Sequence, residues 1–303
     1  MPDDSPPGSR SGRTTSILKP VSNLEIPMVP EQVHNAWRFF RRHGFRRLLR
    51  AAWGARHRLL PFHYRMVLRS QLNRRKYGPG AVTRPLAVVP VSPDIIEYNG
   101  PTFSNEKYIG TVRGGDWDTD VTAFETERMY QGLRERFAAG REWEATQYYA
   151  LAVEQFEANG EWLGYRSLED FRAGRLAYLD QLYADIAEEG YKTQAELPSG
   201  KNDAARHGTS PSHVVQWNEI ACNVARDGEL LLNNGIHRLS IAKILDLETV
   251  PVQFVVRHTE WQQIRTAVAG SDRPADTALE CGVEPTHPDL RRVVPRSTAP
   301  PLV

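Results

Sequence analysis

A histidine and an arginine stand at the start of an expected helix in LLNNGIHRLSIAKIL, directly after an expected strand. Asn234 and Gly235 form the turn, and His237 and Arg238 follow it. A helix N-terminus presents unpaired backbone N–H groups and partial positive charge, and a neighbouring arginine can hold two phosphate oxygens. The stretch therefore indicates a phosphate site. The alternative is an ordinary turn in which Asn234 caps an exposed helix.

Carboxylates alternate in a second motif, GTVRGGDWDTDVTAF. On an extended segment Asp116, Asp118 and Asp120 share one face. Asp116 and Asp118 are thus candidate Mg²⁺ ligands or candidate bases toward a hydroxyl group, and Arg113 is a candidate cofactor-binding residue. The alternative is a tight turn with an Asx hydrogen bond, followed by a helix cap at Asp120 or Thr122.

A third candidate group follows the expected strand that ends in VVRHTEW. Arg257 and His258 stand at the strand end, where residues often line a site, and Trp261 can stack on a base or a sugar. Alternatively, Trp261 completes the core. Glu219 and His258 are further candidates for a catalytic base.

Helical and strand patterns along the sequence predict the elements that position these candidate residues. Residues 85–112 are β-branched with Pro and Gly breaks and predict short strands and turns. Helices are expected at 122–139, at 143–159 before Gly160, and at 167–189, where Ser167 and Asp170 form a capping box and Gly190 ends the helix. After a polar loop at 198–212, we expect two strands around an Asp227–Gly228 hairpin turn, a helix at 236–247, a strand at 250–258 and a helix at 260–269.

The region from about 176 to 258 resembles the ParB/sulfiredoxin-like superfamily, with an insertion near 195–212. The resemblance is carried by LYADIAEEGY, then RDG, then LLNNGIHRLSIAKILDLETVPVQFV. It implies a nucleotide site in which Gly235 lets the backbone approach the phosphates and Arg238 binds them. It also implies that His237 binds a phosphate or moves a proton near neutral pH.

The sequence departs from the pattern of this superfamily at several points, which narrows the range of functions that we expect. Ile236 stands where sulfiredoxin-like members have a catalytic cysteine and where ParB proteins have a polar or acidic residue that supports CTP hydrolysis. Because a Pro-rich tail follows the module, we do not expect the DNA-reading domain that follows it in ParB. The loop is most similar to DGHHR of the free-serine kinases of the superfamily, which implies ATP or ADP. The GGDWD motif followed by this module resembles uncharacterised proteins that accompany surface-glycan assembly.

The charge is distributed unevenly along the 303 residues. Residues 35–76 hold thirteen Lys or Arg and no Asp or Glu, whereas residues 77–303 carry a net charge of −11. Aromatic residues are interleaved with the cations. This basic arm can lie on an anionic membrane surface, bind nucleic acid or pack on the acidic body; we favour the membrane surface.

The apolar runs and the cysteine content exclude other classes of protein. No apolar run is long enough to span a membrane, and the first twenty-four residues lack the apolar core of a signal peptide, so a cytoplasmic location is expected. Two cysteines, Cys222 and Cys281, give neither a metal-binding spacing nor a disulfide framework.

We therefore expect an α+β protein with five parts: a disordered N-terminus (1–30), a basic amphipathic helical arm (31–76), an α+β region with the GGDWD motif (77–165), a ParB/sulfiredoxin-like module of mixed sheet and helix (166–268) and a Pro-rich tail (269–303). The leading hypothesis is an ATP- or ADP-dependent phosphotransferase, peripheral to the cytoplasmic membrane face, that acts on a lipid-linked or soluble glycan. The alternative is a nucleotide-sensing or DNA-associated binding protein without turnover; a nuclease ranks last, because no two-metal carboxylate cluster is evident.

Overall fold

The computed structural model describes residues 62–197 and 219–294, and all of them belong to one unit of the chain. The expected disordered segment 1–30, most of the basic arm 31–76 and the polar loop 198–212 lie outside the described residues.

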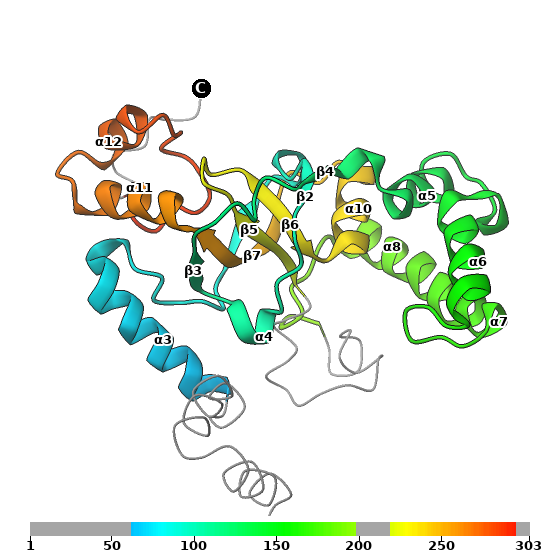
Figure 1. The fold of residues 1–303 in the computed structure, drawn as a ribbon. Coiled ribbons are helices and arrows are strands. Elements are labelled where there is room, and N and C mark those ends of the chain that lie inside the picture. Colours follow the sequence, from blue (N-terminus) through cyan, green and yellow to red (C-terminus); the bar gives the residue numbers. More distant parts are fainter. Residues whose placement is uncertain (1–61, 198–218, 295–303) are drawn as a thin grey trace, which may run out of the picture. The chain divides into compact units, whose positions relative to one another are not determined.

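A mixed sheet lies at the centre of the described part (Figure 1). Its strand order is β1-β7-β5-β6-β2-β4, and β3 pairs with β7 on the edge that β1 also uses. β7 runs parallel to β5 and β3, and β5 runs antiparallel to β6. The strands are β1 (Val88–Val91), β2 (Tyr98–Asn99), β3 (Thr111–Arg113), β4 (Thr122–Ala123), β5 (Ile220–Val224), β6 (Leu230–Asn234) and β7 (Val250–His258). The expected α+β class is confirmed.

Helices border the sheet at two places. α10 packs against α5 and α8, while α11 and α12 lie near the opposite end of the sheet (Figure 1). The α-helices are α3 (Phe62–Tyr77), α4 (Asn105–Tyr108), α5 (Arg128–Phe137), α6 (Gln147–Asn159), α7 (Leu168–Phe171), α8 (Ala177–Glu189), α10 (Ile236–Ile244), α11 (Thr259–Gly270) and α12 (Pro274–Glu280). A π-helical turn, Arg172–Leu176, joins α7 to α8. We call the segment from α5 to α8 the helical region.

The strongest local signals of the sequence are confirmed. The hairpin from β5 to β6 has Asp227 and Gly228 in its loop, and Gly228 adopts a φ of +99° that favours glycine. The Ser167 side chain accepts a hydrogen bond of 3.0 Å from the backbone N–H of Asp170, and α8 ends at Gly190. β7 covers the whole predicted strand, because its β-branched residues are buried on both faces.

The expected helix at 122–139 is wrong at its start. Thr122 and Ala123 instead form β4, which pairs antiparallel with β2, and α5 begins only at Arg128. Pairing with a strand far away in the sequence therefore decides the conformation of these residues, and it overrides their helical pattern.

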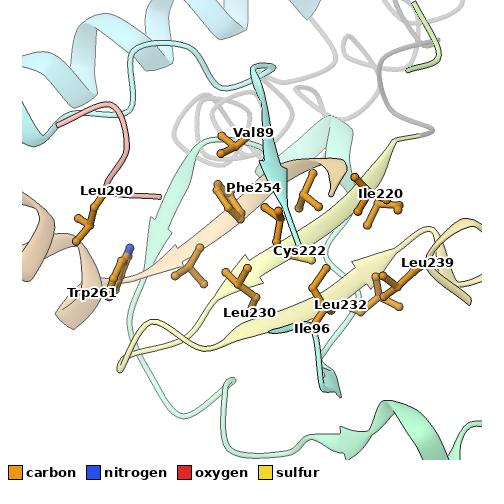
Figure 2. Packing of buried hydrophobic residues seen from close by; sticks show 14 of the residues in the cluster. Val89, Ile96, Ile220, Cys222, Leu230, Leu232, Leu239, Phe254, Trp261 and Leu290 are labelled. Atoms are coloured by element: carbon orange, nitrogen blue, oxygen red, sulfur yellow. The ribbon is translucent and has the colours of Figure 1, made fainter. Parts of the chain in front are cut away.

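The main core lies between the sheet and α10, α11 and α12. Figure 2 shows Ile220 and Cys222 of β5 with Leu230 and Leu232 of β6, and Leu239 of α10 beside them. The helical region has its own core, to which the following buried residues contribute: Leu133, Trp143, Tyr148, Ala152, Phe171, Leu176 and Leu179. Leu182 and Ile186 of α8 pack against Ile241 of α10, so apolar contact fixes the helical region next to the loop before α10.

The expected Pro-rich tail is wrong for the described residues up to Val294. α12 forms within it, and Leu290 is fully buried in the main core (Figure 2). The buried Asp289 accepts hydrogen bonds from Arg257 Nε at 2.8 Å and from Trp261 Nε1 at 2.9 Å, and Arg265 Nε lies 3.4 Å from its carboxylate. A buried ion cluster thus fastens this segment to the sheet.

Candidate functional site

The NGIHR loop connects the end of β6 to the start of α10. Gly235 adopts a φ of +96°, and a Cβ there would lie 2.9 Å from the Cα of Ile220, so only glycine fits. The Asn234 side chain accepts a hydrogen bond from the N–H of Gly235 at 2.8 Å. Among the described residues no side chain caps α10, so the alternative in which Asn234 caps this helix is wrong. The first turn of α10 therefore presents uncapped N–H groups, as an anion site requires.

A pocket of about 290 Å³ opens against this loop. It is lined by residues of the loop and of the helical region: Met129, Leu163, Arg175, Tyr178, Leu182, Asn234, Gly235, Ile236, His237 and Arg238. Two of these residues are arginines, and none of the described lining residues is an aspartate or glutamate. The lining is therefore positively charged.

A hydrogen-bonded group of three side chains joins the helical region to the loop. The hydroxyl of Tyr148 on α6 lies 2.9 Å from Nε2 of His237. Nη2 of Arg175 lies 2.9 Å from Nδ1 and 3.3 Å from Nε2 of the same ring, and Nε of Arg175 donates to the Tyr148 hydroxyl at 3.4 Å. Tyr148 and Arg175 are both buried.

Burial, and then the charge of Arg175, hold the pKa of His237 well below its usual value. The ring is therefore neutral at neutral pH. Burial also raises the pKa of the Tyr148 hydroxyl, so that group is protonated at neutral pH. Arg238, also predicted to bind phosphate, is buried with its guanidinium 5.8 Å from the centre of the Tyr191 ring.

Arg175 was not among the predicted site residues. It lies in the π-helical turn, about sixty residues before the loop in sequence. A signal was present: Phe171, Arg175 and Leu179 recur every four residues, so this arginine occupies the apolar stripe of the helix. A charged residue at such a position requires a buried partner or a ligand.

The GGDWD motif lies at the tip of the β5–β6 hairpin, the loop Ala225–Glu229. The buried Asp118 carboxylate accepts from the backbone N–H of Arg226 at 2.8 Å and from its Nε at 3.0 Å. Nη2 of Arg226 also donates to Asp116 at 2.9 Å and to Asp118 at 2.7 Å. Burial alone raises the pKa of Asp118, but the hydrogen bonds from Arg226 lower it to about 2.

The expectation that Asp116, Asp118 and Asp120 share a face of an extended segment is wrong. The chain turns at this point, and the Thr119 hydroxyl and N–H both donate to the carbonyl of Asp116. The Asp118 side chain is only 1% exposed, whereas the Asp116 side chain is 84% exposed. Among the described residues, no group of three or more His, Cys, Asp or Glu could hold a metal ion.

The other candidates near this motif have structural partners. Nδ1 of His258 accepts from the N–H of Glu260 at 3.2 Å and caps α11, and Nε2 lies 2.9 Å from the carbonyl oxygen of Gly115. The guanidinium of Arg113 lies over the rings of Tyr108 and Phe103, at 4.9 and 5.4 Å from their centres. Arg257 and Trp261 bind Asp289, as described above. These contacts position the turn and the core.

The structure does not bring the two predicted motifs together. Asp116 and Asp118 bind Arg226 at the hairpin tip, whereas the NGIHR loop follows the other end of β6. Five strand residues span about 13 Å. A mechanism in which Asp116 or Asp118 acts on a phosphate held by Arg238 therefore lacks the required proximity.

Glu219 lies at the same end of the sheet as the loop. Its carbonyl oxygen is 3.5 Å from the position that a Cβ of Gly235 would take. Its buried side chain accepts a hydrogen bond of 2.7 Å from the N–H of Gln194. Of the acidic residues named as candidates from the sequence, only this one is placed beside the loop.

Comparison with known proteins gives no relative: no protein-family model, curated protein or solved structure matches the chain. Within the two described ranges, no helix is both long enough and apolar enough to cross a membrane.

Proposed function

We propose that the chain binds the phosphates of a nucleotide, ATP or ADP, in the pocket at the NGIHR loop and transfers a phosphoryl group. One observation carries the proposal. An uncapped helix N-terminus, Arg238 and an arginine from a distant helix, Arg175, line one pocket in which no described lining residue supplies a negative charge. Such a pocket attracts an anion with several oxygens.

The order of elements supports assignment of this module to the ParB/sulfiredoxin-like superfamily. A hairpin with a DG turn, a glycine loop, a helix and a strand follow one another as β5, β6, α10 and β7. In that superfamily the same loop holds nucleotide phosphates, as described for the sequence.

Phosphoryl transfer depends mainly on positioning the phosphoryl group and its acceptor, and on neutralising the negative charge of the phosphates. Gly235 lets the phosphates approach the N–H groups of α10, and Arg175 and Arg238 neutralise their charge. Glu219 lies at this end of the sheet and is the candidate base toward an acceptor hydroxyl. Asp116 and Asp118 do not fit a protein-held Mg²⁺ site, because Arg226 binds both carboxylate oxygens of Asp118 and one of Asp116.

A second candidate function is nucleotide or phosphate sensing without turnover, in a ParB-like module that can also be DNA-associated. The absence of a carboxylate among the described lining residues favours it, because no base lies in the pocket itself.

We place this activity at the cytoplasmic membrane face, in the assembly of a surface glycan. α3, the described end of the basic arm, exposes the apolar residues Tyr64, Val67, Leu68 and Leu72. It contains no acidic residue, and its last turn holds Arg74, Arg75 and Lys76. Apolar and cationic groups on one exposed helix are typical of binding to anionic membranes. A lipid-linked glycan would then lie within reach as the acceptor.

Calorimetric binding of ATP, ADP and CTP, with and without Mg²⁺, tests the phosphate site. Arg238→Gln should weaken binding roughly 10- to 100-fold, the effect of a hydrogen bond to a charged group. Arg226→Gln, which changes an arginine at the other end of the hairpin, is the matched control and should bind normally. If the wild-type protein binds none of these nucleotides, the proposal is wrong.

Turnover separates the two candidate functions. Release of ADP or AMP upon addition of a glycan acceptor supports the phosphotransferase. Tight binding with no product over hours supports the sensor.

The membrane part has its own test. The wild-type chain should sediment with phosphatidylserine vesicles and less with neutral ones. The double variant Leu68→Gln/Leu72→Gln should lose this difference, while its phosphate binding is unchanged. Equal sedimentation of both proteins would remove the membrane from the proposal.

A further inference from the structure

Arg175 is a nearly fully buried cation whose described partners are uncharged. Its relative exposure is 9%, and its hydrogen bonds go to Tyr148 and His237. The ring of Tyr178 lies 5.4 Å from its guanidinium. An arginine stays charged inside a protein, and a buried charge without an opposite charge is costly. Two other buried arginines, Arg257 and Arg265, do pair with a carboxylate, that of Asp289.

The pocket supplies the explanation. Arg175 lines it together with the NGIHR loop, so a ligand in the pocket can provide the missing negative charge. We propose that Arg175 is a ligand-binding residue for a phosphate monoester, and that Tyr148 and His237 are positioning residues that aim its guanidinium into the pocket. This inference rests on the anion pocket of the proposed function and adds its second arginine.

The hydrogen-bond roles within the group follow from chemistry. A guanidinium only donates, so the nearer ring nitrogen of His237, Nδ1, accepts from Arg175. The proton of the neutral ring is then on Nε2, which donates to the Tyr148 hydroxyl. A second ring proton would face the guanidinium, in agreement with the lowered pKa of His237. His237 thus holds Arg175 in place and does not bind phosphate as a cation.

The dimensions of the pocket restrict the ligand class. A volume of about 290 Å³ is at the lower end of the range for ligand pockets, so it suits a phosphate with a small attached group. Met129, Leu163 and Leu182 add apolar lining next to the two arginines. The terminal phosphate of a nucleotide and a phosphorylated sugar share this chemistry.

Calorimetry with inorganic phosphate, ADP and a hexose phosphate tests the assignment. Arg175→Gln should weaken binding of all three roughly 10- to 100-fold. Arg175→Lys keeps the charge but not the planar fork, so it should recover part of the affinity. The melting temperature without ligand shows whether each variant is folded. Preference for ADP over the hexose phosphate, or the reverse, identifies the source of the phosphate.

Two substitutions of His237 separate positioning from direct contact. His237→Asn places an oxygen acceptor near the position of Nδ1, so affinity should stay within about threefold of the wild type. His237→Leu removes the acceptor, so affinity should fall roughly tenfold. Tyr148→Phe should resemble His237→Leu in direction with a smaller effect, because Nδ1 still holds Arg175.

Three results decide the inference. If Arg175→Gln and Arg175→Lys bind like the wild type while Arg238→Gln does not, Arg175 is only a structural residue and the inference is overturned, but the proposed function stands. If His237→Asn loses as much affinity as His237→Leu, the positioning role is wrong. If the wild-type chain binds no phosphate compound, the proposed function fails as well.

Discussion

The two ends of the β5–β6 hairpin both carry an arginine beside a glycine turn, yet they differ in how the charge is satisfied. At the hairpin tip, Arg226 binds Asp116 and Asp118, and two carboxylates surround one guanidinium. At the loop end, Arg175 and Arg238 line a pocket in which no described lining residue is acidic. The charge of Arg226 is therefore balanced by carboxylates of the chain, whereas the described hydrogen-bond partners of Arg175, Tyr148 and His237, are uncharged.

Under the proposed function, this difference separates residues that hold the fold from residues that bind a ligand. The sequence motif with the most carboxylates, GGDWD, has its charges used internally. The NGIHR motif contributes Arg238 to a pocket whose described lining has no acidic residue. A buried charged residue therefore indicates a functional site when no opposite charge accompanies it. Burial of a charged residue alone does not indicate one.

The buried ion cluster around Asp289 is the most extreme case of charges that are balanced within the chain. Burial alone raises the pKa of Asp289, but Arg257 and Arg265 hold it well below its usual range. Asp289→Asn leaves two buried cations without a carboxylate and should destabilise the fold by about 3–5 kcal/mol, a fall of roughly 10 °C in the melting temperature. Asp276→Asn, which breaks an exposed pair with Arg273, should change stability by less than about 0.5 kcal/mol. Equal effects of the two changes would contradict the difference between buried and exposed pairs.

At the hairpin tip, Asp118→Asn should cost about 2 kcal/mol at neutral pH. The pKa of Asp118 is lowered from 3.8 to about 2, so its contribution is complete above pH 3.8 and is lost as the pH falls through 2. Asp116→Asn, in the same motif but with an exposed side chain, is the control and should have a small effect. Chemical denaturation between pH 2 and 7 measures both. Weakened phosphate binding in Asp118→Asn would show that the two ends are coupled.

At the loop end, acid should weaken the fold through His237. Because its folded-state pKa lies well below 6.5, the unfolded chain binds the proton more readily, and stability is lost as the pH falls below 6.5. The slope attributable to this group is at most about 1.4 kcal/mol per pH unit. His237→Asn should lack this part of the slope, while the partly buried His287, whose pKa is also lowered, contributes equally to both proteins. Parallel curves for the two proteins between pH 5 and 6.5 would refute the neutral assignment of the ring.

Leu163, which lines the pocket, has a φ of +49° although it is not glycine. Left-handed backbone costs a residue with a side chain roughly 1–2 kcal/mol, and glycine loses more entropy on folding, so Leu163→Gly should stabilise by about 0.5–1 kcal/mol. Leu163→Ala keeps the backbone cost and removes the apolar contact, so it should weaken a hexose phosphate more than inorganic phosphate. If Leu163→Gly lowers the melting temperature, the backbone conformation there is not strained.

Local signals predicted much of the fold. The hairpin, β7 and the boundaries at Ser167 and Gly190 depend on residues that are close in sequence, so their patterns were sufficient. The strand pairing of Thr122 and the burial of Leu290 depend on partners far along the chain, which local propensity does not indicate.

The candidate site was predicted in part for the same reason. The loop residues Asn234, Gly235 and Arg238 line the pocket as one contiguous motif. Arg175 reaches it only through the packing of α8 on α10, and Asp118 is removed from it by its bonds to Arg226. Spacing alone could not distinguish these two outcomes.

The π-helical turn before α8 has a consequence for how such a pocket can arise or disappear. A π turn is in effect one extra residue in an α-helix, and each residue of an α-helix advances by about 100° around the axis. Loss of a single codon between Arg172 and Leu176 would restore a regular helix and rotate everything before the turn relative to α8. One in-frame deletion could thus separate Arg175 from the aromatic side chains around Phe171, and one insertion could have brought them together.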